Sequence, residues 1–249
     1  MPAHTDAAPD AIQPGGWAAP CPGTHNAPCV WPGEQAARAP RPLIVFDLDG
    51  TLLDSYELAN EGHRRAIAAL GLPPVSLAVL EALNGPSAEG ACHILGLPLS
   101  RQAELEAALE AADDVLIPTW ARLFPGVLSM LEVLTGRATL CLLTHGQPSY
   151  LHAVCAVTGM EGFFAERAGF TPGVSKAMRI REWAQRHGAP RALMVGDRPT
   201  DLDAAREAGA VAVGVTYGAG SAQEMAGADA LAHDLAQVCE ICLAFCAGT

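Results

Sequence analysis

The sequence predicts an α/β fold, a three-layer Rossmann-like parallel sheet into which an all-helical cap domain is inserted. Short apolar runs alternate with helix-period segments from residue 43 onward, which is typical of strands buried between two layers of helices. One long stretch carries only helical periodicity and interrupts that alternation. These observations predict the fold, because alternating strands and helices build a parallel sheet through right-handed crossovers.

Four apolar runs are the predicted strands of the core. Each is bounded by polar residues or glycine, and they cover residues 43–46, 140–143, 193–195 and 211–215. In an open parallel sheet the ligand site lies at the carboxyl ends of the strands. The residues that directly follow these runs are therefore the candidates for a functional site.

The helical interruption is interpreted as a cap domain, residues 55–124. Its stretches of apolar helical periodicity are 67–70, 77–83 and 105–116. The α/β core is then made of residues 43–54 and 125–249. The two junctions between core and cap are the expected hinge.

The first 42 residues differ from the rest of the chain. Nine of them are Pro and four are Gly, and they show neither helix nor strand periodicity. Such a segment lacks the apolar side chains to bury a core, so we expect residues 1–42 to be a disordered arm.

Composition narrows the functional class. The 249 residues carry 27 acidic and 15 basic side chains, a net charge of −12, without a cluster of Lys and Arg. Nucleic acid is therefore not an expected partner, because a polyanion is bound through clustered cations. A cytoplasmic location without membrane contact is expected, because a secretory signal and a bilayer-spanning apolar stretch are both missing.

The cysteines are expected to be free thiols, as in a reducing compartment. Cys239, Cys242 and Cys246 share one face of a predicted C-terminal helix. Packing in the core is favoured for them over a metal site, because no second ligand pair accompanies them.

The first predicted strand ends in a pair of acids. Asp47 and Asp49 lie two residues apart, and Gly50 lets the chain turn sharply behind them. Two carboxylates at this spacing can face one crevice. An Asp-Gly turn is also a common strand ending, so the pair alone is only suggestive.

The second predicted strand ends in Thr144 and His145, and Pro148 follows in a position typical of a first helical turn. A hydroxyl beside the free N–H groups of a helix start is a phosphate-binding arrangement. Taken singly, Thr144 would be interpreted as a helix N-cap. Its position relative to Asp47 favours the phosphate role.

The third predicted strand ends in two further acids, Asp197 and Asp201. Four carboxylates in one crevice would repel one another by roughly several kcal/mol per close pair, so a hard cation is required and Mg²⁺ is the natural candidate. The alternative is a helix cap at Asp201 and a surface turn at Asp197.

Lys176 is the only Lys among the 15 basic residues, and it begins the helical segment between the second and third predicted strands. A compact, rotatable ammonium suits a phosphoryl oxygen in a crowded site better than a guanidinium does. A solvated helix start is the alternative interpretation.

These motifs together resemble a known family. In chain order they are Asp47-x-Asp49-Gly50-Thr51, Thr144, Lys176 and Gly196-Asp197-x-x-x-Asp201. The order is similar to that of the haloacid dehalogenase-like hydrolase superfamily, and of its phosphoglycolate phosphatase-like members with a helical cap. The resemblance covers residue 43 to about residue 240.

The resemblance implies a Mg²⁺-dependent phosphatase that hydrolyses a small phosphorylated metabolite, phosphoglycolate-like or a sugar phosphate. Asp47 would attack phosphorus and form an aspartyl-phosphate, while Asp49 would act as general acid and base. The residues implied to hold phosphoryl oxygens are Thr144, His145 and Lys176. The implied Mg²⁺ ligands are Asp47, the backbone carbonyl of Asp49, Asp197 and, in or near the coordination shell, Asp201.

Alternatives to this function stay open. Asp49 favours phosphoryl transfer over dehalogenation, because halide departure needs no proton, and Thr51 favours a phosphatase over a phosphosugar mutase. A non-catalytic protein that binds phosphate or a partner is disfavoured by the two acids and the single Lys. A monomer or a homodimer is expected.

Other polar residues are expected to matter less. Arg198 is expected to point to solvent rather than toward a metal. The cap residues whose contact with substrate is disfavoured are His63, Arg64, Arg65, His93 and the loop at 84–86.

Overall fold

The structure is a computed structural model that describes residues 40–248. The predicted disordered arm lies outside the described residues, apart from residues 40–42. The carbonyl of Pro42 accepts a backbone hydrogen bond of 2.9 Å from the N–H of Thr139, so the chain enters the sheet at this residue.

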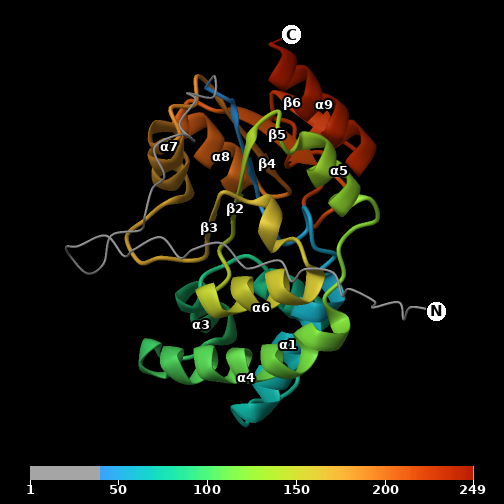
Figure 1. Ribbon diagram of the computed structural model, residues 1–249. Helices are drawn as coiled ribbons and strands as arrows, with labels where there is room; N and C mark the ends of the chain where they lie inside the picture. The colour runs from blue at the N-terminus through green and yellow to red at the C-terminus, as the bar shows by residue number, and fades with distance from the viewer. Residues whose placement is uncertain (1–39, 249) are drawn as a thin grey trace, which may run out of the picture. The chain divides into compact units, whose positions relative to one another are not determined.

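Six parallel strands form one sheet in the order β3-β2-β1-β4-β5-β6 (Figure 1). They are β1 (Leu43–Phe46), β2 (Thr139–Leu143), β3 (Glu166–Ala168), β4 (Ala192–Gly196), β5 (Val211–Val215) and β6 (Ala230–Ala232). The first strand lies between β2 and β4, with Leu43 opposite both Thr139 and Ala192. The predicted parallel sheet is confirmed, and its four predicted strands are the four central ones.

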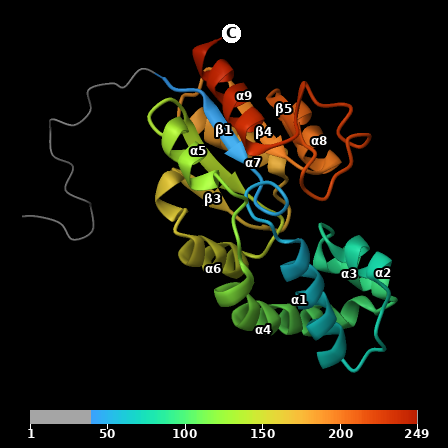
Figure 2. The ribbon, with the colours of Figure 1, turned by 90° about the vertical axis from the view of Figure 1, so that its right-hand side faces the viewer.

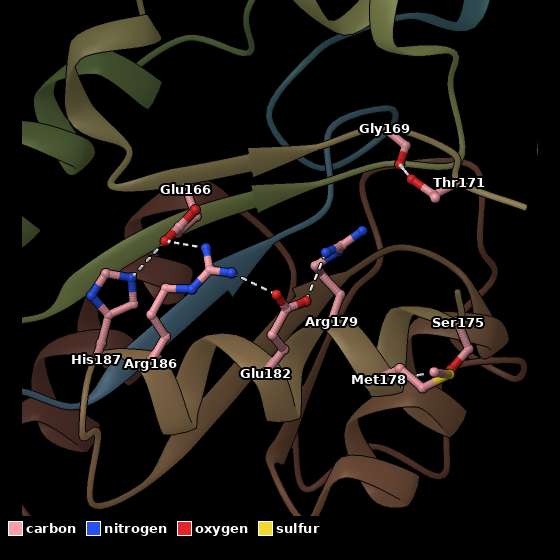
Figure 3. A network of polar contacts seen from close by, with 9 residues as sticks. All are labelled: Glu166, Gly169, Thr171, Ser175, Met178, Arg179, Glu182, Arg186 and His187. Atoms are coloured by element: carbon pink, nitrogen blue, oxygen red, sulfur yellow. Dashed lines mark hydrogen bonds and ion pairs between the residues drawn. The ribbon is translucent and has the colours of Figure 1, made fainter. Parts of the chain in front are cut away.

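The two edge strands escape the sequence pattern. β3 consists of Glu166, Arg167 and Ala168, which form no apolar run. A strand at the edge of a sheet is partly solvated and needs no such run. Glu166 is held instead by the end of the neighbouring helix, where Nη1 of Arg186 and Nε2 of His187 lie 2.9 and 3.1 Å from its Oε1 (Figure 3).

Helices cover both faces of the sheet (Figures 1 and 2). One layer contains α5 (Val127–Leu134), α6 (Pro148–Thr158) and α9 (Leu235–Ala247), and the other contains α7 (Lys176–Arg186) and α8 (Pro199–Ala208). Ile44 and Phe46 of β1 pack into the first layer, whereas Leu43 and Val45 pack into the second. This alternation explains why the whole strand is apolar, and it confirms the three-layer architecture.

Helices alone make up the insertion between β1 and α5. They are α1 (Tyr56–Ala69), α2 (Leu77–Leu83), α3 (Ala88–Leu95) and α4 (Gln102–Trp120), and a short 3-10 helix at Leu99–Arg101 precedes the last of them. Ser76 and Ser87 cap α2 and α3 through their hydroxyl oxygens. The insertion has its own apolar cluster, which includes Ile67, Leu83 and Leu105. The predicted all-helical insertion is confirmed.

The C-terminal helix α9 contains the predicted cysteine face. Cys242 is buried, and Cys239 and Cys246 are partly buried against the same apolar cluster. The expected core packing is confirmed, and the six cysteines in the described part of the chain are free. None of the described helices combines the length and the apolar character needed to cross a membrane.

Candidate active site

Three buried carboxylates meet at the carboxyl edge of the sheet. Asp47 directly follows β1, Asp197 directly follows β4, and Asp201 lies in the first turn of α8. Each offers an oxygen within 4.8 Å of the oxygens of the other two. Because β1 and β4 are neighbours, acids far apart in the sequence share one crevice. The surface-turn alternative for Asp197 is wrong, since that residue is only 1% exposed.

Lys176 lies inside this acidic crevice. Its Nζ donates hydrogen bonds of 2.6 Å to Oδ1 of Asp47 and 2.6 Å to Oδ1 of Asp201. Ser175 begins the helix by accepting the N–H of Met178 on its Oγ at 3.2 Å, which places Lys176 at the first helical position (Figure 3). The solvated-helix-start interpretation of Lys176 is therefore wrong.

The charges in the crevice oppose one another. Burial raises the pKa of Asp47 well above its usual value, and Asp201, Asp197 and Asp49 raise it further, while Lys176 acts against them. Burial would lower the pKa of the Lys176 ammonium, but Asp201 and Asp47 outweigh it and raise that pKa. One ammonium thus serves several carboxylates, and the crevice keeps an excess of negative charge.

Asp197 has one oxygen engaged and one oxygen without a partner. Its Oδ2 accepts the N–H of Ala219 at 2.8 Å, whereas its Oδ1 is buried and makes no hydrogen bond. Burial raises the pKa of Asp197 to about 6, although the N–H of Ala219 acts against this. Gly50, at a φ of 71°, packs so close that a Cβ on it would lie 2.1 Å from Oδ2 of Asp197. Glycine is therefore required there for space as well as for the turn.

Asp201 differs from Asp197, because the protein engages both of its oxygens. Oδ1 accepts from Lys176, and Oδ2 accepts the backbone N–H of Arg198 at 3.1 Å, which caps α8. The helix cap at Asp201, which the sequence offered as the alternative to a metal site, is present and coexists with the ion pair. Gly196 makes room for this carboxyl group, since a Cβ there would lie 2.4 Å from it.

Asp49 is held by two hydroxyl groups at the ends of neighbouring elements. Tyr150 donates to its Oδ1 at 2.6 Å, and Oγ1 of Thr144 donates to its Oδ2 at 3.2 Å. Burial raises the pKa of Tyr150 well above its usual value, and the charge of Asp49 adds to this, so the phenol keeps its proton. Oγ1 of Thr144 also accepts the N–H of Gly146 at 2.9 Å. Predicted residues Asp49 and Thr144 thus lie together.

Tyr150 and Ala219 were not among the predicted site residues. Tyr150 is the third residue of α6, and the carboxyl edge of a sheet faces the first turn of the helix that follows a strand. The position of Pro148 at the helix start, which the sequence does predict, is the signal that could have identified Tyr150. Ala219 contributes only its backbone N–H, for which its side chain gives no signal.

A cavity of about 970 Å³ lies between this crevice and the cap helices. Figure 2 shows the arrow of β1 running toward α1 and α4, so the carboxyl edge faces the cap. Asp47, Asp49 and Lys176 line the core side. His145 also lines the cavity, and burial together with Lys176 lowers the pKa of its imidazole, which favours the neutral form.

Arg198 connects the core to the cap. Its Nη2 donates a hydrogen bond of 2.9 Å to the carbonyl oxygen of Asn84, in the loop between α2 and α3. The expectation that Arg198 points to solvent is therefore wrong. The sequence could not indicate this contact, because its acceptor is a backbone carbonyl in a distant loop.

The cap residues named from the sequence divide into two groups. His63 and the loop at 84–86 line the cavity. Arg64 and Arg65 instead pair with Glu61 on the exposed side of α1, and His93 lies near Glu89. These last three side chains are not part of the cavity lining.

Comparison with known proteins identifies the family. The profile of the haloacid dehalogenase-like hydrolases matches residues 44–215, which include the strands that carry the acids. The chain belongs to the haloacid dehalogenase-like hydrolase family. The described motifs at the ends of β1, β2 and β4 are all inside the matched region.

Curated relatives of this haloacid dehalogenase-like hydrolase are similar over most of its length. A phosphoglycolate phosphatase of Synechococcus elongatus is 31% identical over 189 residues, which is 74% of this chain and 88% of the relative. A 5'-nucleotidase of Pseudomonas aeruginosa is 30% identical over 191 residues, which is 74% of this chain and 86% of the relative.

Solved structures support the same fold for this haloacid dehalogenase-like hydrolase. A haloacid dehalogenase-like family hydrolase from Streptococcus pneumoniae superposes with a TM-score of 0.72 at 25% identity, over 82% of this chain and 99% of the other. A predicted phosphoglycolate phosphatase from Haemophilus somnus gives a TM-score of 0.72 at 23% identity, over 81% of this chain and 97% of the other.

Proposed function

We propose that this haloacid dehalogenase-like hydrolase is a phosphatase that hydrolyses a small phosphate monoester, with Asp47 as nucleophile. The observation that carries the proposal is the pair Asp47 and Asp49 at the end of β1, facing one cavity with Lys176 against the first acid and Thr144 against the second. The names of the curated relatives, phosphoglycolate phosphatase and 5'-nucleotidase, support the same reaction class.

The two acids of β1 would take different roles. A carboxylate oxygen of Asp47 attacks phosphorus, the bond from phosphorus to the ester oxygen breaks, and Asp49 gives its proton to the departing alcohol. Asp49 then takes a proton from the water that attacks the aspartyl-phosphate, which releases inorganic phosphate and restores Asp47. Tyr150 and Thr144 hold the carboxylate of Asp49 in place for both proton transfers.

Two features of the crevice suit a divalent cation. Three buried carboxylates lie together, Lys176 pairs with only two of them, and Oδ1 of Asp197 is buried without a partner. Carboxylate and carbonyl oxygens are the ligands that Mg²⁺ prefers. Asp47, Asp197 and the backbone carbonyl of Asp49 would hold Mg²⁺, with Asp201 beside them. When bound, Mg²⁺ would reduce the negative charge that otherwise repels an anionic substrate.

The phosphoryl oxygens would be held by other donors around Asp47. Lys176 supplies an ammonium already fixed by two carboxylates, and Thr144 supplies a hydroxyl at the start of the turn before α6. His145 lines the same cavity and would contact the phosphoryl group in its neutral form. A phosphate has several oxygens to satisfy, so these donors complement one another.

The test is phosphate release by the purified protein with Mg²⁺, from p-nitrophenyl phosphate and a panel of phosphorylated metabolites. Asp47→Asn should lower kcat by about 10³-fold or more, because the nucleophile is lost. Asp203→Asn is the matched control, since Asp203 lies exposed on α8 and, among the described residues, pairs with Arg206 alone.

Three outcomes would contradict the proposal. One is an absence of phosphate release from every substrate of the panel. Another is an Asp47→Asn variant that keeps the wild-type rate. Interconversion of hexose monophosphates without net phosphate release would instead support a mutase.

A further inference from the structure

The cap side of the cavity is lined by carboxylates. The acidic residues that α2 and α4 contribute to the lining are Glu81, Glu106, Glu110, Asp113 and Asp114. The structure describes all of the cap helices, and none of their Lys or Arg residues belongs to this lining. Arg64 and Arg65 pair with Glu61 outside the cavity, and Arg101 pairs with Glu104.

The core contributes two cations to the cavity lining, Lys176 and Arg198. Lys176 is engaged by Asp47 and Asp201, and the guanidinium of Arg198 donates to the carbonyl of Asn84. Burial lowers the pKa of His63, whose Nδ1 lies 2.8 Å from the carbonyl oxygen of Ala59. An anionic group that enters the cavity beside α4 would meet carboxylates first, because Lys176 is already paired and Arg198 is held at the loop between α2 and α3.

Asp113 is a cap carboxyl group that lines the same cavity as Asp49 of the core. It packs over α1 where Gly62 has no side chain, since a Cβ on that glycine would lie 3.7 Å from its Oδ1. Burial raises the pKa of Asp113 to about 7, and the charge of Asp49 adds to the effect. Asp113 likewise raises the pKa of Tyr150, the donor to Asp49. Within the described residues Asp113 has neither a hydrogen bond nor an ion pair.

The departing alcohol is the part of the substrate that would meet Asp113. In the proposed function Asp49 protonates the ester oxygen, so the alcohol extends from phosphorus past Asp49. Asp113 lines the same cavity as Asp49, and the charge of Asp49 acts on it, so Asp113 borders that path.

We propose that the cap selects phosphate monoesters whose alcohol carries hydroxyl or ammonium groups and no anion, with Asp113 as the specificity-determining residue. This inference rests on the proposed phosphatase function. A hydroxyl or an ammonium would donate a hydrogen bond to the free acceptors of the cap. A carboxylate on the alcohol, such as that of phosphoglycolate, would instead be repelled.

Three phosphate esters whose alcohols each have two carbon atoms test the inference. They are 2-hydroxyethyl phosphate, phosphoethanolamine and 2-phosphoglycolate, which differ only in the neutral, cationic or anionic end of the alcohol. The readouts are kcat/KM with Mg²⁺, and the inhibition constant of each ester against p-nitrophenyl phosphate turnover. We expect the first two to exceed 2-phosphoglycolate in kcat/KM by about tenfold or more, and to inhibit correspondingly better.

At pH 8, above the raised pKa of Asp113, Asp113→Asn should raise kcat/KM for 2-phosphoglycolate about fivefold, because one like charge is removed, and change the value for 2-hydroxyethyl phosphate by less than about twofold. Glu104→Gln is the matched control, since Glu104 lies on the same helix outside the cavity lining. Glu110→Gln is a second variant of the lining, in case Asp113→Asn folds poorly.

Two results would overturn the charge selection. One is 2-phosphoglycolate turned over and bound as well as the neutral ester by the wild-type protein. The other is an unchanged ratio among the three esters in both cavity variants. Loss of all turnover, including that of p-nitrophenyl phosphate, would contradict the phosphatase function itself and so is distinguishable from failure of this inference.

Discussion

The core side and the cap side of the cavity are both acidic, but their carboxylates have different neighbours. On the core side, Asp47 and Asp201 share Lys176, and Asp49 accepts from Tyr150 and Thr144. On the cap side, Asp113 has no donor within the described residues, and another acid of the lining, Glu81, is held there only by the hydroxyl of Tyr56. Carboxylates on the core side are fixed in position, which suits chemistry, whereas those on the cap side keep free acceptors for a ligand.

Removing the cation of the core side should have the largest effect. Lys176→Met leaves Asp47 and Asp201 buried without their shared partner, which should lower the free energy of unfolding by about 3–5 kcal/mol. Loss of the same ammonium should lower kcat by roughly 10²-fold or more. Chemical denaturation and phosphate release measure the two effects.

The exposed end of the same helix supplies the control for that prediction. Arg186→Met removes surface ion pairs with Glu166 and Glu182 (Figure 3), and because solvent screens such pairs the free energy of unfolding should change far less than in Lys176→Met. A Lys176→Met variant as stable as Arg186→Met would show that the buried ion pairs do not hold the core side together.

Loosening one acid of the core side should have a smaller effect. Tyr150→Phe removes the hydroxyl that donates to Oδ1 of Asp49. If that hydrogen bond fixes the proton-transferring carboxylate, kcat should fall about tenfold while KM changes by less than about twofold. Steady-state kinetics separate the two constants. Tyr56→Phe is the control, because the hydroxyl of Tyr56 donates to Glu81 on the cap side, and an equal fall in both variants would contradict the role of Tyr150.

Neutralising the cap side should change stability in a pH-dependent way, and by less than the loss of Lys176 does. Asp113 has its pKa raised from 3.8 to about 7, mainly by burial. Between these two values the folded state holds a proton that the unfolded state has lost, so stability falls as the pH rises from about 4 to about 7.

Asp113→Asn removes this loss. The free energy of unfolding of the variant should exceed that of the wild type by about 1–3 kcal/mol at pH 8, and by nothing comparable at pH 4. This range is smaller than the full pKa shift would give, because the side chain of Asp113 is partly exposed to solvent. Thermal or chemical denaturation at both pH values measures the gain. An equal gain at pH 4 and pH 8 would assign it to helix propensity rather than to charge.

The core side could be predicted from the sequence because chain order and sheet topology coincide there. Asp47, Thr144 and Asp197 each follow a continuous apolar run, and the runs are apolar because helices cover both faces of the sheet. Once the strands are recognised, their carboxyl ends must share an edge. The placement of Lys176 in that crevice required one further observation, that it is the only Lys of the chain.

The cap side could not be predicted in the same way. Asp113 and Glu110 lie on a helix that also carries exposed acids, and helical periodicity does not show which acid faces the cavity. That depends on how α4 packs against α1 beside Gly62. The edge strand β3 escaped prediction for a related reason, because side-chain contacts to Glu166 hold it rather than an apolar run.

The hydrogen bond from Arg198 to Asn84 ties the turn between Asp197 and Asp201 to a loop of the cap. Its acceptor is a main-chain oxygen, so the tether depends on the course of the loop. The hydrogen bond of 3.1 Å from Nδ2 of Asn84 to Oδ1 of Asn60 and the left-handed backbone of Gly85 both set that course. A substitution at either position, or an insertion or deletion that moves the carbonyl, would therefore release the arginine that lies between two acids of the crevice.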